Sequence, residues 1–143
     1  MRYQRFDSRL QVRLESGEKV LEVLTAFAAR EGIAYGAVNG IGAVRWVRLA
    51  YLNAVQKKYE AYEFEEQLEV VSLTGNVTRR DGEPFFHLHI SLARPDLSLI
   101  GGHFIDAIVR PTLEVSIQQE AAAVTRVPDE ASGLALMDLP ERG

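Results

Sequence analysis

The chain has 143 residues, which suits one domain, and its 47% hydrophobic and 25% charged residues are typical of a globular protein. It contains no cysteine, which excludes disulfides and thiolate metal sites, and we expect a cytoplasmic protein. No segment resembles a signal peptide or approaches the ~18 apolar residues of a membrane helix, so no membrane association is predicted. The net charge of −4 lowers the expectation of nucleic-acid binding, which usually needs a basic patch.

The first predicted elements are a strand followed by the one clear helix. Residues 9–14 alternate polar and apolar side chains, as a half-buried strand does. Ser16 is a candidate helix N-cap, and Gly32 suits the C-terminal stop. Between them lies an apolar stripe at helical spacing, formed by Val20, Leu21, Leu24, Phe27 and Ala28.

Most of the remaining chain is predicted to form strands. β-branched and aromatic residues dominate it, and Asp81-Gly82 is a strong hairpin signal. We therefore predict an α/β fold of the α+β type, in which one main helix packs on a mixed, largely antiparallel sheet of seven or eight strands. Residues 1–125 form this domain, and residues 126–143 form a C-terminal arm held by Leu134, Leu136 and Met137.

All three histidines fall in the stretch FFHLHISLARPDLSLIGGH, residues 85–103. Side chains alternate along a strand, so His87 and His89 share one face, about 6.6 Å apart. The opposite face is fully apolar and must point to the core: it comprises Phe86, Leu88, Ile90 and Leu92. If the two segments pair as a hairpin, His103 comes near enough to supply a third nitrogen, and Gly101 and Gly102 allow close backbone approach.

Three imidazoles with an open fourth position are typical of a catalytic zinc site, although copper, nickel and iron also bind imidazole. The alternative is three unrelated polar residues, and spacing alone leaves both open. Glu69 and Glu114 are candidates for a second shell or an acid–base role. Glu69 aligns with the apolar residues Val71 and Leu73, so its carboxylate lies either at a strand end in water or in a buried pair. The alternative for both glutamates is a solvated sheet residue.

Several motifs occur in an order that resembles the plant and prokaryote conserved domain, the PPC domain. They are VRLESGEKV (12–20), GIGAV (40–44), LEVVSLTGNV (68–77), HLHISLA (87–93), GGH (101–103) and TLEVSI (112–117). The resemblance covers residues 7–120 and implies a homotrimer of single α/β domains. It also implies, as in similar stand-alone prokaryotic members, zinc bound by His87, His89 and His103. Plant members carry an AT-hook and generally lack these histidines, and this chain has no AT-hook.

Three functions follow as hypotheses. The leading one is a trimeric, zinc-binding protein with a regulatory role, whose subunit contacts use Trp46, Tyr51, Tyr59 and Tyr62. Those aromatic residues could equally lie beneath the helix. The second function is sequence-tolerant DNA binding. The third is a zinc-dependent enzyme that uses metal-bound water, with Glu69 or Glu114 as base.

Overall fold

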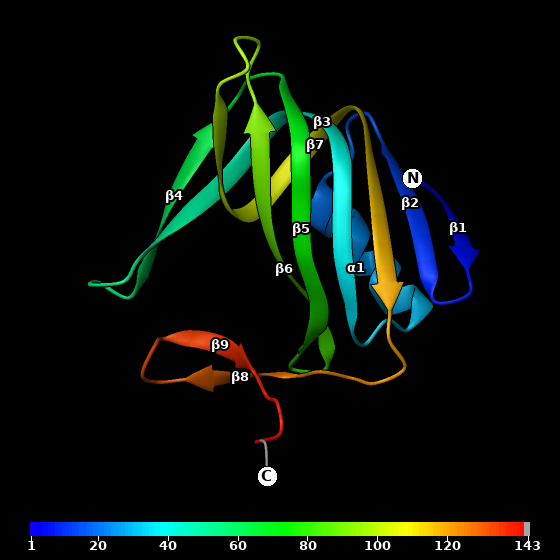
Figure 1. Cartoon of the computed structure of the whole chain (residues 1–143), viewed down its shortest axis with the longest axis vertical. Helices are drawn as coiled ribbons and strands as arrows, with labels where there is room; N and C mark the ends of the chain where they lie inside the picture. The colour runs from blue at the N-terminus through cyan, green and yellow to red at the C-terminus, as the bar shows by residue number, and fades with distance from the viewer. Residues whose placement is uncertain (142–143) are drawn as a thin grey trace.

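A computed structural model describes residues 1–141, which form one helix and nine strands (Figure 1). The elements are β1 (Arg2–Phe6), β2 (Arg9–Glu15), α1 (Val20–Glu31), β3 (Gly36–Asn53), β4 (Lys58–Phe64), β5 (Leu68–Arg80), β6 (Glu83–Ala93), β7 (Leu99–Gln119), β8 (Arg126–Asp129) and β9 (Leu134–Met137). No helix in this part of the chain is long and apolar enough to cross a membrane.

The predicted helix is present, and its apolar stripe packs against β6 and β7. Gly32 ends it in the left-handed conformation, with φ of 66°, as expected. The predicted cap is wrong, because the helix begins at Val20 and its N-cap residue, Lys19, makes no side-chain cap bond. Instead, Oδ1 of Asp106 on β7 accepts a hydrogen bond from the backbone N–H of Leu21 at 3.1 Å. A distant residue thus supplies the acceptor that Ser16 was expected to provide.

Seven strands form one sheet in the order β1-β2-β7-β6-β5-β3-β4, and all of its ladders are antiparallel. The predicted turn at Asp81-Gly82 joins β5 to β6. The long strand β7 pairs with β3 as well as with β2 and β6, so β3, β5, β6 and β7 close into a ring of ladders. Figure 1 shows α1 behind β3 and β7. The fold is therefore the predicted α+β class, with an antiparallel sheet.

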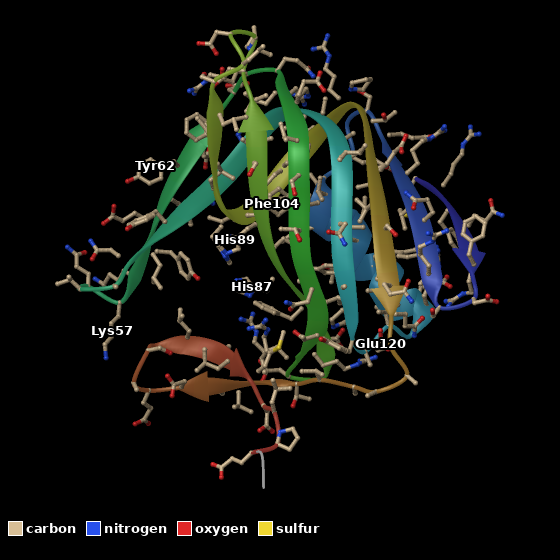
Figure 2. All side chains as sticks on the ribbon, in the orientation of Figure 1. Lys57, Tyr62, His87, His89, Phe104 and Glu120 are labelled. Carbon is tan, nitrogen blue, oxygen red and sulfur yellow. The ribbon has the colours of Figure 1, made fainter. Side chains whose placement is uncertain are left out.

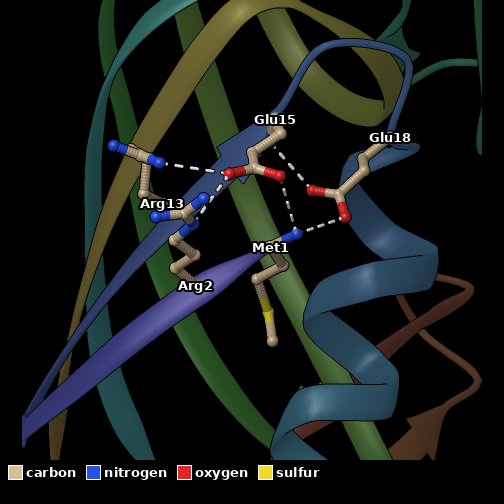
Figure 3. A network of polar contacts seen from close by, with 5 residues as sticks. All are labelled: Met1, Arg2, Arg13, Glu15 and Glu18. Atoms are coloured by element: carbon tan, nitrogen blue, oxygen red, sulfur yellow. Dashed lines mark hydrogen bonds and ion pairs between the residues drawn. The ribbon is translucent and has the colours of Figure 1, made fainter.

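The N-terminal edge of the sheet is tied to the start of α1 by charged groups (Figure 3). The amino group of Met1 donates to Oε1 of Glu18 at 2.6 Å and lies 3.8 Å from Oε2 of Glu15. Glu15 also pairs with Arg2 at 3.3 Å and Arg13 at 3.1 Å. This network fixes the exposed strand β1. Strand β1 is one edge of the seven-stranded sheet, and β4 is the other edge.

The C-terminal arm contains a second, two-stranded sheet, β8–β9. Its approach to the main sheet is fixed by a hydrogen bond from the N–H of Arg79 to the carbonyl of Val124 at 2.8 Å. The last two residues of the predicted arm, 142–143, lie outside the described residues. Figure 1 shows this hairpin near the lower end of β6, and Arg126 at the start of β8 contacts His87 of β6.

Candidate metal centre

Strand β6 presents His87 and His89 on the face away from the core. The opposite face is buried as predicted, since Phe86, Leu88, Ile90 and Leu92 belong to the core. Figure 2 shows the two histidines one below the other along β6, with His87 nearer the β8–β9 hairpin. His89 is exposed and His87 is half-buried.

The antiparallel register of β6 and β7 places His103 directly opposite His89. The ring centroids of the three histidines form a nearly equilateral triangle, with sides of 5.4 Å (His87–His89), 5.3 Å (His87–His103) and 5.4 Å (His89–His103). One nitrogen from each ring lies within 4.8 Å of the other two. The two strand segments therefore bring three candidate ligands to one point.

Two glycines permit this close approach of β7 to its neighbours. A Cβ on Gly101 would lie 2.4 Å from the carbonyl oxygen of Ile90 on β6. A Cβ on Gly102 would lie 3.0 Å from the carbonyl oxygen of Ala50 on β3. Both distances are shorter than ordinary contacts, so the absence of side chains holds β7 close to both strands just before His103.

His103 has a buried nitrogen with no hydrogen-bond partner, its Nδ1. Its ring stacks on Tyr59 of β4 with a centroid distance of 4.6 Å. Burial, and then the neighbouring His87 and His89, lower the pKa of His103 to about 4. The ring is therefore neutral at neutral pH. An unpaired buried nitrogen costs about 1–3 kcal/mol, a cost that a bound cation would offset.

His87 contacts the C-terminal hairpin through Arg126, whose Nη2 lies 3.2 Å from Nδ1 of His87. Burial first, then Arg126 and His89, lower the pKa of His87. A guanidinium can only donate, so Nδ1 of His87 is the acceptor in this contact. With Nδ1 as the acceptor, the proton of the neutral His87 ring lies on Nε2, so His87 binds a metal only when this contact with Arg126 is released.

A hollow of about 400 Å³ adjoins the cluster. It is lined by His87 and His103 together with Lys57, Tyr59, Arg80, Phe85, Arg126, Gly133, Leu134, Ala135 and Leu136. The sequence did not predict a site role for the basic residues Lys57, Arg80 and Arg126. They come from three separate places in the chain, the β3–β4 turn, the end of β5 and the start of β8. The only signal in the sequence was the apolar pattern at 134–137, which predicted docking of the arm and not a wall of a site.

The structure does not bring Glu69 or Glu114 to the histidines. Both line a separate hollow with Ile41, Gly42 and Thr112, among others, and none of the histidines takes part in it. Glu69 pairs with Ala93, four residues or about 13 Å beyond His89 along β6. A bulge between Val70 and Ser72 also changes the alternation, so that Glu69 and Val71 are exposed while Leu73 is buried.

The donor set suits a borderline-soft cation such as zinc. Among residues 1–141 the cluster consists of three imidazoles and no carboxylate, and three imidazole nitrogens match the ligands of sites with an open fourth position. Around tetrahedral zinc, ligand nitrogens lie about 3.4 Å apart, so the rings need to approach one another by little more than an ångström. The unpaired Nδ1 of His103 is an available donor for this.

Comparisons with known proteins agree with this fold. The model of the Plants and Prokaryotes Conserved (PCC) domain matches residues 1–120. A crystal structure of a "putative dna binding protein" from Bacteroides thetaiotaomicron is similar, with 30% identity, a TM-score of 0.93 and 96% coverage of both chains. No curated protein sequence matches the chain.

Two archaeal structures are also similar. A plant- and prokaryote-conserved protein of Pyrococcus horikoshii has 29% identity and a TM-score of 0.86, with 99% of this chain and 96% of that one covered. A protein of Archaeoglobus fulgidus described as metal-containing has 31% identity and a TM-score of 0.84, with 96% and 99% covered. From its motifs, its fold and these matches, the chain belongs to the family of the Plants and Prokaryotes Conserved domain.

Proposed function

We propose that the chain binds a divalent metal ion, zinc in the first place, through His87, His89 and His103. The observation that carries the proposal is the meeting of three imidazoles around the unpaired Nδ1 of His103. The description of the Archaeoglobus relative as metal-containing supports it. When bound, zinc would supply a Lewis acid with one coordination position left for water or a ligand.

The test is elemental analysis of the purified protein beside two double variants. We expect about one zinc per chain in the wild type and none above background in His87→Ala/His89→Ala. Glu69→Gln/Glu114→Gln is the matched control and should keep the full metal content. Unchanged zinc in the histidine variant, with a native circular dichroism spectrum, would move the site elsewhere.

We further propose that the chain assembles as a homotrimer through the β3–β4 hairpin. Its aromatic residues are uncovered within one chain: Tyr51 is 70% exposed, Tyr62 50% and Tyr59 42%, whereas Trp46 is half-buried. The three tyrosines are exposed and so do not lie beneath the helix, and exposed aromatic residues on and beside an edge strand favour subunit contacts. Figure 2 shows Tyr62 and Lys57 along this projecting hairpin.

Sedimentation equilibrium tests the assembly. We expect a trimer mass for the wild type and a smaller mass for Tyr51→Ser/Tyr62→Ser. Phe6→Ser, which changes a residue 44% exposed on the opposite edge strand, is the control and should remain trimeric. A monomeric wild type at micromolar concentration would refute the proposal.

DNA binding is a second candidate function, supported by the description of the Bacteroides relative. Because the chain carries a net charge of −4, such binding would have to use a local basic surface of the assembled protein. Its signature is a duplex-DNA affinity that falls steeply as salt rises, measured by fluorescence anisotropy. Absence of binding at 50 mM salt would reject it.

A zinc-dependent enzyme is the third candidate, supported by the hollow that adjoins the histidines. It predicts a turnover that is lost on chelation and restored by zinc. Since Glu69 and Glu114 lie in another hollow, neither serves as the base in a single chain.

A further inference from the structure

The lining of the hollow beside the histidines carries positive charge and no carboxylate; the carboxylate of Asp129 interacts with Lys57 from outside the lining. Lys57, Arg80 and Arg126 line it, and none of its lining residues is acidic. None of the three is in an ion pair with an acidic residue of the described chain. This contrasts with Arg94, whose guanidinium is paired with Glu66 at 2.8 Å.

Arg126 is held in place by neutral groups alone. Its Nε donates to the hydroxyl of Thr78 at 3.1 Å, Nη1 to the carbonyl of Ala135 at 2.9 Å, and Nη2 to Oδ1 of Asn76 at 3.0 Å. Thr78 is fully buried, so this end of the guanidinium is fixed by the sheet. The cation is therefore preorganised in a half-buried position although nothing neutralises it.

A second guanidinium lies on the same aromatic ring. Arg80 stacks on Phe85 with its Cζ 4.2 Å from the ring centroid, and Arg126 lies 5.5 Å from that centroid. Two like charges gathered around one half-buried ring disfavour each other unless an anion lies between them.

The remaining wall is apolar and comes mostly from the C-terminal hairpin. Leu134, Ala135 and Leu136 line the hollow together with the aromatic residues Tyr59 and Phe85. Its volume of about 400 Å³ lies at the lower end of the range for small-molecule pockets. A compact molecule with one anionic group and a short apolar body matches both parts of this lining.

We propose that the hollow binds a small organic oxyanion, a carboxylate or a phosphate ester, between Arg80, Arg126 and the histidine cluster. The part of the proposal that concerns the cluster rests on the proposed metal function, since the anion would reach the open side of the bound ion. The guanidiniums provide forked donors suited to either oxyanion. The β8–β9 hairpin is then part of the binding site, because it supplies Arg126 and the apolar wall.

Isothermal titration calorimetry with two probes, inorganic phosphate and butanoate, tests the proposal on the zinc-loaded and the metal-free protein. We expect one saturable site per chain in the zinc-loaded form, with weaker binding to the metal-free form. Arg80→Gln is the informative variant, because Arg80 is exposed and its loss leaves the hairpin contacts intact. It should weaken binding about tenfold, as expected for one charge-assisted hydrogen bond.

Arg45→Gln is the control, since Arg45 is exposed on β3 and does not line the hollow, and its affinity should equal that of the wild type. Preference for phosphate over butanoate would identify a phosphate ester as the ligand class, and the reverse a carboxylate. No binding of either probe to protein that holds zinc would overturn the anion proposal and leave the metal proposal intact. If zinc itself fails to bind, the titrations of the metal-free protein test the anion site alone. Binding of a probe that is weakened by Arg80→Gln supports the anion site, and absence of binding overturns it.

Discussion

Replacement of Gly101 by alanine tests whether close packing of β6 and β7 shapes the histidine cluster. The new Cβ would lie 2.4 Å from the carbonyl oxygen of Ile90, whereas ordinary contacts begin at 3.4 Å. Relief of this contact requires the two strands to separate locally by about 1 Å, which weakens ladder hydrogen bonds that are optimal near 2.9 Å. Overpacking of this kind costs about 1–3 kcal/mol of unfolding free energy.

The same displacement should affect metal binding, because Gly101 lies two residues from His103 and pairs with Ser91, two residues from His89. We expect the zinc affinity of Gly101→Ala to fall by about tenfold or more, a loss typical of disturbed ligand support. Urea unfolding in the presence of chelator measures the stability, and competition with a chromophoric chelator measures the affinity. All variants are compared at one protein concentration, because assembly would shift the midpoints.

Gly102→Ala is the matched control for this experiment. Its Cβ would lie 3.0 Å from the carbonyl oxygen of Ala50, so a shift of a few tenths of an ångström accommodates it. We expect it to cost less than about 1 kcal/mol. Equal stability and equal zinc affinity of the Gly101 and Gly102 variants would refute the reasoning.

Three further predictions concern the groups around the cluster and the helix. The metal-free protein should lose stability as pH falls from about 6.5 toward 4, because His103 has its pKa lowered to about 4 while the unfolded chain binds the proton earlier. The loss of unfolding free energy is at most about 3 kcal/mol, and it is smaller where water screens the ring. If the urea midpoint of a His103→Gln variant showed the same pH dependence, this prediction would be contradicted. Asp106→Ala should cost about 1 kcal/mol in thermal or urea unfolding, through the lost bond to the N–H of Leu21, whereas Asp138→Ala should cost nearly nothing. Arg126→Ala should release the β8–β9 hairpin, so that limited proteolysis cuts near residues 130–133 faster than in Arg80→Gln; equal cutting rates would show that Arg126 does not hold the hairpin.

The elements that sequence predicted well are those with an unbroken local period. The stripe of α1 and the alternation of β6 each specify one buried face, so the helix and the outward direction of His87 and His89 follow from neighbouring residues alone. The turn at Asp81-Gly82 is equally local, because both residues adopt positive φ there.

The features that were missed depend on contacts between distant segments. Asp106, 85 residues from Leu21, replaces the expected cap at Ser16. The bulge after Val70 moves Glu69 out of the alternation on which its predicted role was based. Arg126 reaches His87 from 39 residues away, on a strand of four residues that is too short to show a period.

X-ray absorption at the zinc edge of the loaded protein tests the central claim most directly. We expect about three imidazole nitrogens at roughly 2.0–2.1 Å from the zinc and one further light ligand, with this signature abolished in His87→Ala/His89→Ala. A coordination shell of oxygen ligands without imidazole scattering, or a spectrum unchanged by the double substitution, would contradict it.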